Sequence, residues 1–65
     1  MGEIHVVRQF MPDVARCMAH FNMVMRMLLD RHDQAADLYL AGVKVDDGEL
    51  VYVTVMRMIE AAHDE

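Results

Sequence analysis

The chain has little that could support enzymatic chemistry. It contains no serine or tryptophan, and its single cysteine, Cys17, excludes an intrachain disulfide. A nucleophile needs a base within reach and usually a third group to orient it. Cys17 and His20 form the only candidate pair, and no glycine-rich turn near them offers an oxyanion or phosphate site. We therefore expect no enzyme, no catalytic residues and no cofactor.

Basic residues and long apolar runs are also scarce. Six lysines and arginines stand against eleven acids, for a net charge of −5, and the three arginines of the first half are scattered. Direct nucleic-acid binding needs several converging basic side chains, so it is disfavoured. No apolar run approaches the roughly 18 residues of a membrane span. The first residues lack a basic leader followed by an apolar region, so we expect a soluble, cytoplasmic protein.

The small size of the chain limits its core. Its 65 residues suit one small domain, 1–65, and a chain this short buries only about 60% of its unfolded surface. Small domains gain stability from disulfides, a metal or self-association. Because a disulfide is excluded, self-association is the expected source of additional stability.

Apolar residues recur at heptad spacing through nearly half of the chain, and this spacing predicts one long amphipathic helix over about residues 12–41. Pro12 and Asp13 suit its first turn, and Gly42 suits the left-handed conformation just past its end. The weak point is the polar run 30–33, where Asp33 could cap a separate helix and give three helices. The heptad positions are Met11, Val14, Met18, Phe21, Met25, Leu28, His32, Ala35 and Tyr39.

The sequence of the C-terminal third is compatible with two structures, a helix and a β-hairpin. Asp46 and Glu49 resemble a helix capping pair, which predicts a shorter helix over about 47–63. Residues 51–55 favour a strand instead, and Asp47-Gly48 suits a hairpin turn. Strict alternation would put Arg57 on an apolar face, which favours the helix. The fold class is therefore an all-α helical hairpin with an N-terminal arm or short strand over 3–10; the alternative is an α+β fold with a C-terminal β-hairpin.

The longer helix is almost twice the length of the shorter one, so part of its apolar stripe stays uncovered. A second copy would complete a small bundle, and we expect a homodimer. His32 is the one polar residue of the stripe and could fix its register. The predicted self-association seam consists of Val14, Met18, Phe21, Met25, Leu28, His32 and Tyr39.

A second surface, for binding a partner, is predicted beside the stripe, at His20, Met23 and Met27. Thioether and imidazole groups suit Cu(I), and Cys17 with His20 could begin a zinc site, but the spacing completes neither, so no metal ligands are assigned. Methionines also form adaptable protein-binding surfaces. The sequence favours a small, acidic, non-enzymatic regulatory adaptor or inhibitor that binds a larger protein through a methionine-rich helix surface. The alternatives are a copper- or zinc-binding module and a structural subunit of a larger assembly.

Overall fold

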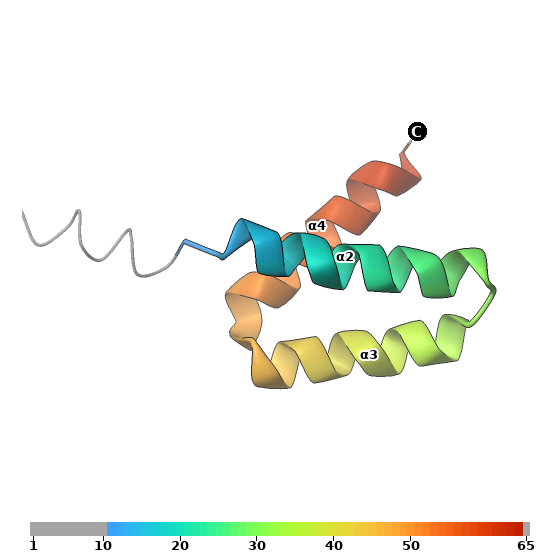
Figure 1. The fold of residues 1–65 in the computed structure, drawn as a ribbon, viewed down its shortest axis with the longest axis horizontal. Helices are drawn as coiled ribbons and strands as arrows, with labels where there is room; N and C mark the ends of the chain where they lie inside the picture. The colour runs from blue at the N-terminus through green and yellow to red at the C-terminus, as the bar shows by residue number, and fades with distance from the viewer. Residues whose placement is uncertain (1–10, 65) are drawn as a thin grey trace, which may run out of the picture.

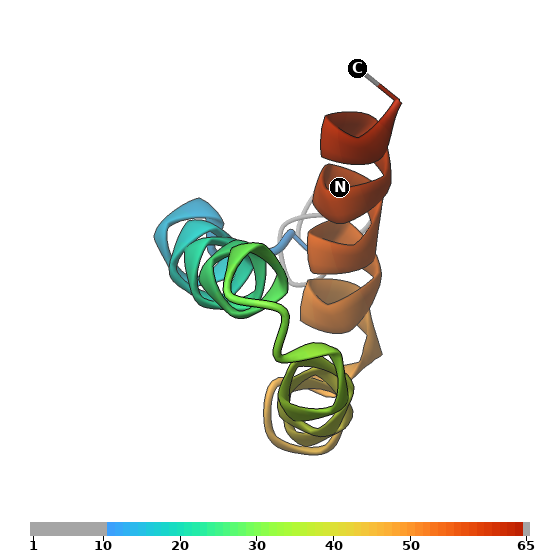
Figure 2. The same ribbon diagram turned by 90° about the vertical axis from the view of Figure 1, so that its right-hand side faces the viewer.

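The computed structural model describes residues 11–64, which form three α-helices (Figure 1). They are α2 (Val14–Leu29), α3 (Asp33–Asp46) and α4 (Gly48–His63). α2 and α3 lie side by side in opposite directions, and α4 turns away from the end of α3 at an angle to both (Figures 1 and 2). No strand occurs in this range, so the all-α expectation is confirmed for it.

A local polar side chain caps α2, whereas the predicted capping pair Asp46 and Glu49 does not cap α4. Asp46 ends α3, and the N-cap residue of α4, Asp47, makes no side-chain capping bond. The Asp13 side chain accepts a hydrogen bond from the backbone N–H of Arg16 at 3.2 Å and so caps α2. Pro12 and Asp13, predicted inside the first turn, therefore lie just before it. α4 agrees with the predicted helix 47–63. The alternative of a C-terminal β-hairpin is wrong, because Val51 and Val55 are buried one helical turn apart while Arg57 is exposed.

The predicted single helix over 12–41 is also wrong, because the chain reverses at residues 30–32. Arg31 has a left-handed φ of 62°. The His32 N–H donates to the Met27 carbonyl at 2.8 Å, and the Arg31 N–H donates to that of Leu28 at 3.1 Å. This pair of bonds is the Schellman arrangement that ends many helices. Gly42, expected just past a helix end, lies inside α3 instead.

All three helices contribute to one small core. The buried residues of α2 are Cys17 and Val24, one residue out of phase with the heptad positions Met18 and Met25. Viewed along α2 and α3, the helices are arranged as a triangle with α3 at one corner (Figure 2). A central cluster is formed by Cys17, Val43, Val51 and Val55, with Phe21, Tyr39, Leu40, Tyr52, Met58 and Ile59 packed against it.

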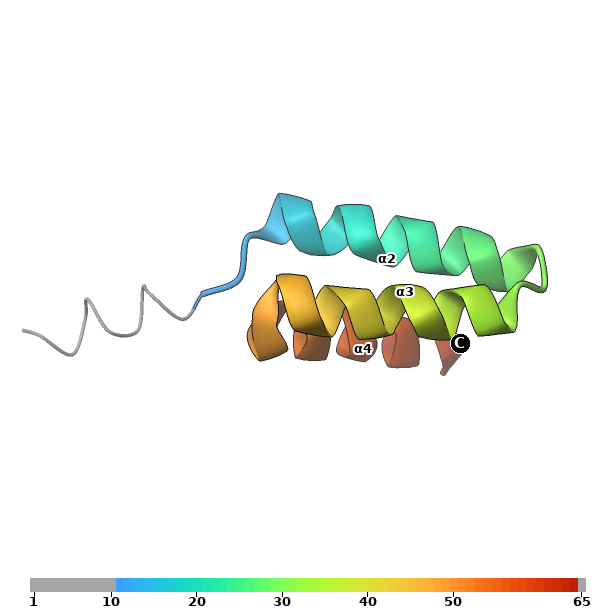
Figure 3. The same cartoon turned by 90° about the horizontal axis from the view of Figure 1, so that it is seen from below.

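Seen from the side of α3, α4 lies behind that helix, so α3 forms an outer layer (Figure 3). None of the helices in residues 11–64 is long and apolar enough to span a bilayer. The predicted N-terminal arm or strand over 3–10 lies outside the described residues.

Candidate functional site

A group of polar side chains joins α2 to the corner between α3 and α4. The Nδ1 of His20 lies 2.6 Å from the Tyr39 hydroxyl oxygen, and its Nε2 lies 2.5 Å from Oδ2 of Asp47. The guanidinium of Arg16 pairs with Oδ1 of the same carboxylate. Arg16 and His20 of α2 thus meet the carboxylate of Asp47, and Tyr39 of α3 joins the group through His20. The Asp47 side chain is only 3% exposed.

Both ring nitrogens of His20 face a polar partner, so the imidazole lies between Tyr39 and Asp47. The bond between Nδ1 and the Tyr39 hydroxyl takes its direction from the tautomer of the ring, and Nε2 lies within ion-pair distance of the Asp47 carboxylate. The contact of Arg16 with Oδ1 is an ion pair without the angular geometry of a hydrogen bond, and Oδ1 has no other donor within residues 11–64. The buried carboxylate therefore depends on Arg16 and His20 for its compensation.

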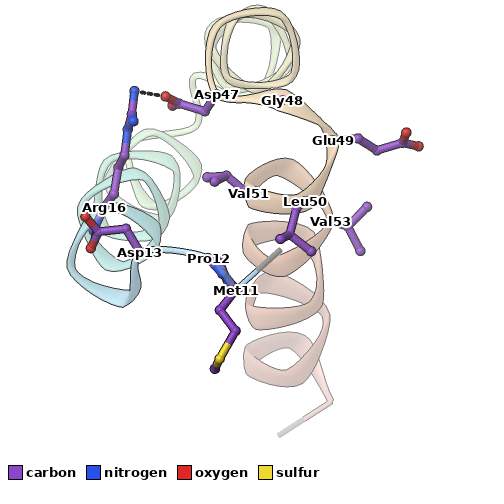
Figure 4. Close-up of a pocket in the computed structure, with 10 residues that line it drawn as sticks. All are labelled: Met11, Pro12, Asp13, Arg16, Asp47, Gly48, Glu49, Leu50, Val51 and Val53. Carbon is purple, nitrogen blue, oxygen red and sulfur yellow. Dashed lines mark hydrogen bonds and ion pairs between the residues drawn. The ribbon is translucent and has the colours of Figure 1, made fainter. Parts of the chain in front are cut away.

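An apolar cleft lies beside this polar group, between the N-terminal ends of α2 and α4. Its volume is about 690 Å³. Met11 and Leu50 lie in the space between the two helices, and the Arg16–Asp47 contact stands at one end (Figure 4). The cleft is lined by Met11, Pro12, Asp13, Arg16, Asp47, Gly48, Glu49, Leu50, Val51 and Val53. Neither His20 nor Tyr39 lines it.

The residues of the predicted self-association seam do not share one exposed face. Phe21 and Tyr39 pack against the core, and Met25 and Leu28 are half-buried beside a smaller hollow of about 270 Å³ at the other end of α4. Val14, Met18 and His32 are exposed, and the last lies in the break between α2 and α3.

The predicted partner surface is likewise divided. His20 is turned into the polar group, Met27 is half-buried and Met23 is exposed. Cys17, proposed with His20 as the start of a metal site, is fully buried. Among residues 11–64 there is no group of three or more His, Cys, Asp or Glu side chains arranged to hold a metal ion.

A polar group of Asp47 and Arg16 with His20 was not predicted from the sequence. Asp47, next to Gly48, is typical of a turn, and Tyr39 fits the spacing of the apolar stripe. Tyr39 is 19 positions from His20 in the chain, so only the antiparallel packing of α2 on α3 brings their rings together. The one local signal was the presence of Arg16 and His20 one turn apart on α2.

Comparison with known proteins identifies no relative: no family model, no curated protein and no solved structure matches this chain.

Proposed function

We propose that this chain is a non-enzymatic, cytoplasmic regulatory protein that binds a larger protein through the apolar cleft between α2 and α4. Its action as an adaptor or inhibitor would consist of occupying a surface of that partner. Self-association, expected from the sequence, belongs to the same proposal. The cleft contains one methionine, Met11. We therefore propose the cleft as the binding surface in place of His20 and Met27.

The observation that carries the proposal is the exposure of large apolar side chains around a hollow. Met11 is 68% exposed and Leu50 is 42% exposed, and both line the cleft together with Val53. Single exposed apolar residues are common on proteins, but a concave group of them is typical of a binding site. Methionine adapts to partners of different shape because it is unbranched and flexible.

The charges around the cleft favour a basic partner. Asp13 and Glu49 are exposed at its edge, while the one basic lining residue, Arg16, is paired with Asp47. An exposed acidic rim around an apolar floor complements an apolar side chain that is flanked by lysine or arginine. The net charge of −5 would also speed the approach of such a surface.

Affinity capture from the cells that produce the protein tests this proposal. Tagged wild type, Leu50→Asp and Leu29→Asp would be compared by quantitative mass spectrometry. Leu29 is the matched control, because it is 80% exposed on α2 and does not line the cleft between the N-terminal ends of α2 and α4. We expect one protein to be enriched by wild type and by Leu29→Asp and to be lost with Leu50→Asp.

Two results would overturn the proposal. Equal capture by all three proteins would show that the cleft does not bind the partner. Failure of wild type to enrich any other protein would contradict the adaptor function. Circular dichroism of each variant shows that its helices remain folded, so a lost partner cannot be attributed to unfolding.

A further inference from the structure

The outer face of α3 is apolar although no other described element covers it. Leu38 is 76% exposed and Val45 is 82% exposed, and Ala41 and Gly42, between them, are also exposed. The spacing of three, four and seven residues puts all four on one side of the helix. α2 and α4 both lie on one side of α3 (Figure 2).

This outer face is distinct from the face that α3 turns to the core. The buried residues of α3 are Ala36 and Val43, and each stands two positions before one of the exposed pair Leu38 and Val45. Two positions along a helix correspond to more than half a turn. α3 is therefore apolar on two opposite sides, of which the fold uses one.

Two charged residues flank the outer face in a self-complementary order. Asp37 and Lys44 are seven positions apart, so they lie on the same flank about 10 Å from each other, too far to pair within the helix. The ion pairs within residues 11–64 all involve Asp47, so neither residue is in one. The Lys44 ammonium lies 5.3 Å from the centre of the Tyr52 ring, at the edge of the face.

We propose that a second copy of this chain covers the outer face of α3, with the two α3 helices antiparallel. A two-fold axis between Ala41 and Gly42 would set Leu38 opposite Val45 of the second copy. A two-fold axis also brings equal flanks together. Asp37 of each copy then meets Lys44 of the other, so one arrangement satisfies both the apolar and the charged residues.

The small residues at the axis support the same arrangement. No atom lies within 4 Å of the position that a Cβ on Gly42 would occupy, so nothing within the described fold fills the space there. A glycine and an alanine at the crossing point let two helix axes approach at the short end of the usual 8–10 Å range.

The area of the face sets the expected strength. The 14 residues of α3 give a strip about 21 Å long and 10 Å wide, which is smaller than the interfaces of stable complexes. The dimer should therefore form and dissociate with protein concentration. This proposal deepens the self-association part of the proposed function and is independent of partner binding at the cleft.

Cross-linking through a single new cysteine tests the arrangement. Ala41→Cys would place two thiols across the two-fold axis, while Asn22→Cys on the exposed side of α2 serves as the control. The native Cys17 is fully buried and does not compete. Under mild oxidation we expect Ala41→Cys to form the disulfide-linked dimer about tenfold faster, because association raises the effective thiol concentration. Equal rates for the two variants would overturn the proposal.

Sedimentation of the chain without new cysteines separates this proposal from the broader function. We expect wild type and Leu29→Glu to show a concentration-dependent dimer and Leu38→Glu to stay monomeric, with unchanged helix content. Asp37→Lys should weaken the dimer, and the double swap Asp37→Lys with Lys44→Asp should restore it. A dimer that survives Leu38→Glu but is lost with Met18→Glu would overturn the α3 face and favour the predicted seam. A wild type that stays monomeric would overturn self-association altogether, whereas the capture experiment would still decide partner binding.

Discussion

The two corners of this molecule reverse the chain by different means. Between α2 and α3, the reversal is made by the backbone of residues 30–32, with Arg31 left-handed at φ 62° and two hydrogen bonds back to the end of α2. Between α3 and α4, Gly48 is left-handed at φ 80° and the preceding residue, Asp47, sends its side chain to α2. The first corner is held by local bonds, and the second by a contact with another helix.

The first corner therefore depends on local structure, and the second depends on tertiary structure. The first corner needs only its own few residues, although it carries a side chain where glycine would fit better. The second corner has Gly48 at the left-handed position, but the neighbouring Asp47 carboxylate is compensated only when α2 is in place. We therefore expect changes at the second corner to affect the whole fold and changes at the first to have smaller effects.

The largest effect is expected from Asp47→Ala. This change removes the shared ion-pair partner of Arg16 and His20 and should lower the free energy of unfolding by about 2–3 kcal/mol. Urea unfolding followed by circular dichroism measures it. Asp46→Ala is the matched control, because Asp46 is the exposed neighbour and its loss should stay within about 0.5 kcal/mol. Equal effects of the two changes would mean that the polar group does not hold the corner.

Local signals in the sequence were enough to predict a helix start close to Asp13 and a helix over about 47–63, but not the capping of α4. Asp13 marks the helix start as its N-cap, with Pro12 one residue before it, although both were expected inside the first turn. Arg57 distinguished helical from alternating spacing. The break between α2 and α3 was predicted only as an alternative. Its left-handed residue is Arg31 rather than glycine, while Gly42, which appeared to end a helix, lies within one.

The buried face of α2 could not be chosen from spacing alone. Cys17 and Val24 are seven residues apart, and so are Met18 and Met25, which gives two overlapping apolar stripes one residue out of phase. Periodicity identifies a helix, but only the position of α3 and α4 decides which stripe is covered. For the same reason the polar group around Asp47 was not predicted, since its members come from distant parts of the chain.

Gly48→Ala is expected to have the next largest effect. A Cβ at this position would have open space around it, so the cost comes from the φ of 80° alone. A left-handed conformation costs a side-chain-bearing residue about 1–2 kcal/mol, and we expect the free energy of unfolding to fall by that amount. Thermal unfolding would measure it as a lower Tm. An unchanged Tm would show that the second corner tolerates an ordinary backbone conformation.

Arg31→Gly should act in the opposite direction at the first corner. Glycine adopts the left-handed conformation without the steric cost that Arg31 bears, although it also gives the unfolded chain more freedom. We expect a net gain of about 1 kcal/mol in the free energy of unfolding. The same urea titration measures the gain. Arg26→Gly, inside α2, is the control and should destabilise, because it introduces glycine where the backbone is helical. A loss of stability in both variants would show that the Arg31 side chain contributes more than its backbone strain costs.

Gly42→Ala should have the smallest effect and complete the comparison of the glycines. Gly42 lies inside α3, outside the left-handed region, and no atom is within 4 Å of the added Cβ. Alanine is the better helix former, so we expect the free energy of unfolding to rise by about 0.7 kcal/mol, measured at low protein concentration, where the chain is monomeric. The same chemical change thus has opposite signs at Gly42 and Gly48, because only the second glycine occupies a conformation that a side chain opposes. A loss of stability at Gly42 would contradict its placement within a regular helix.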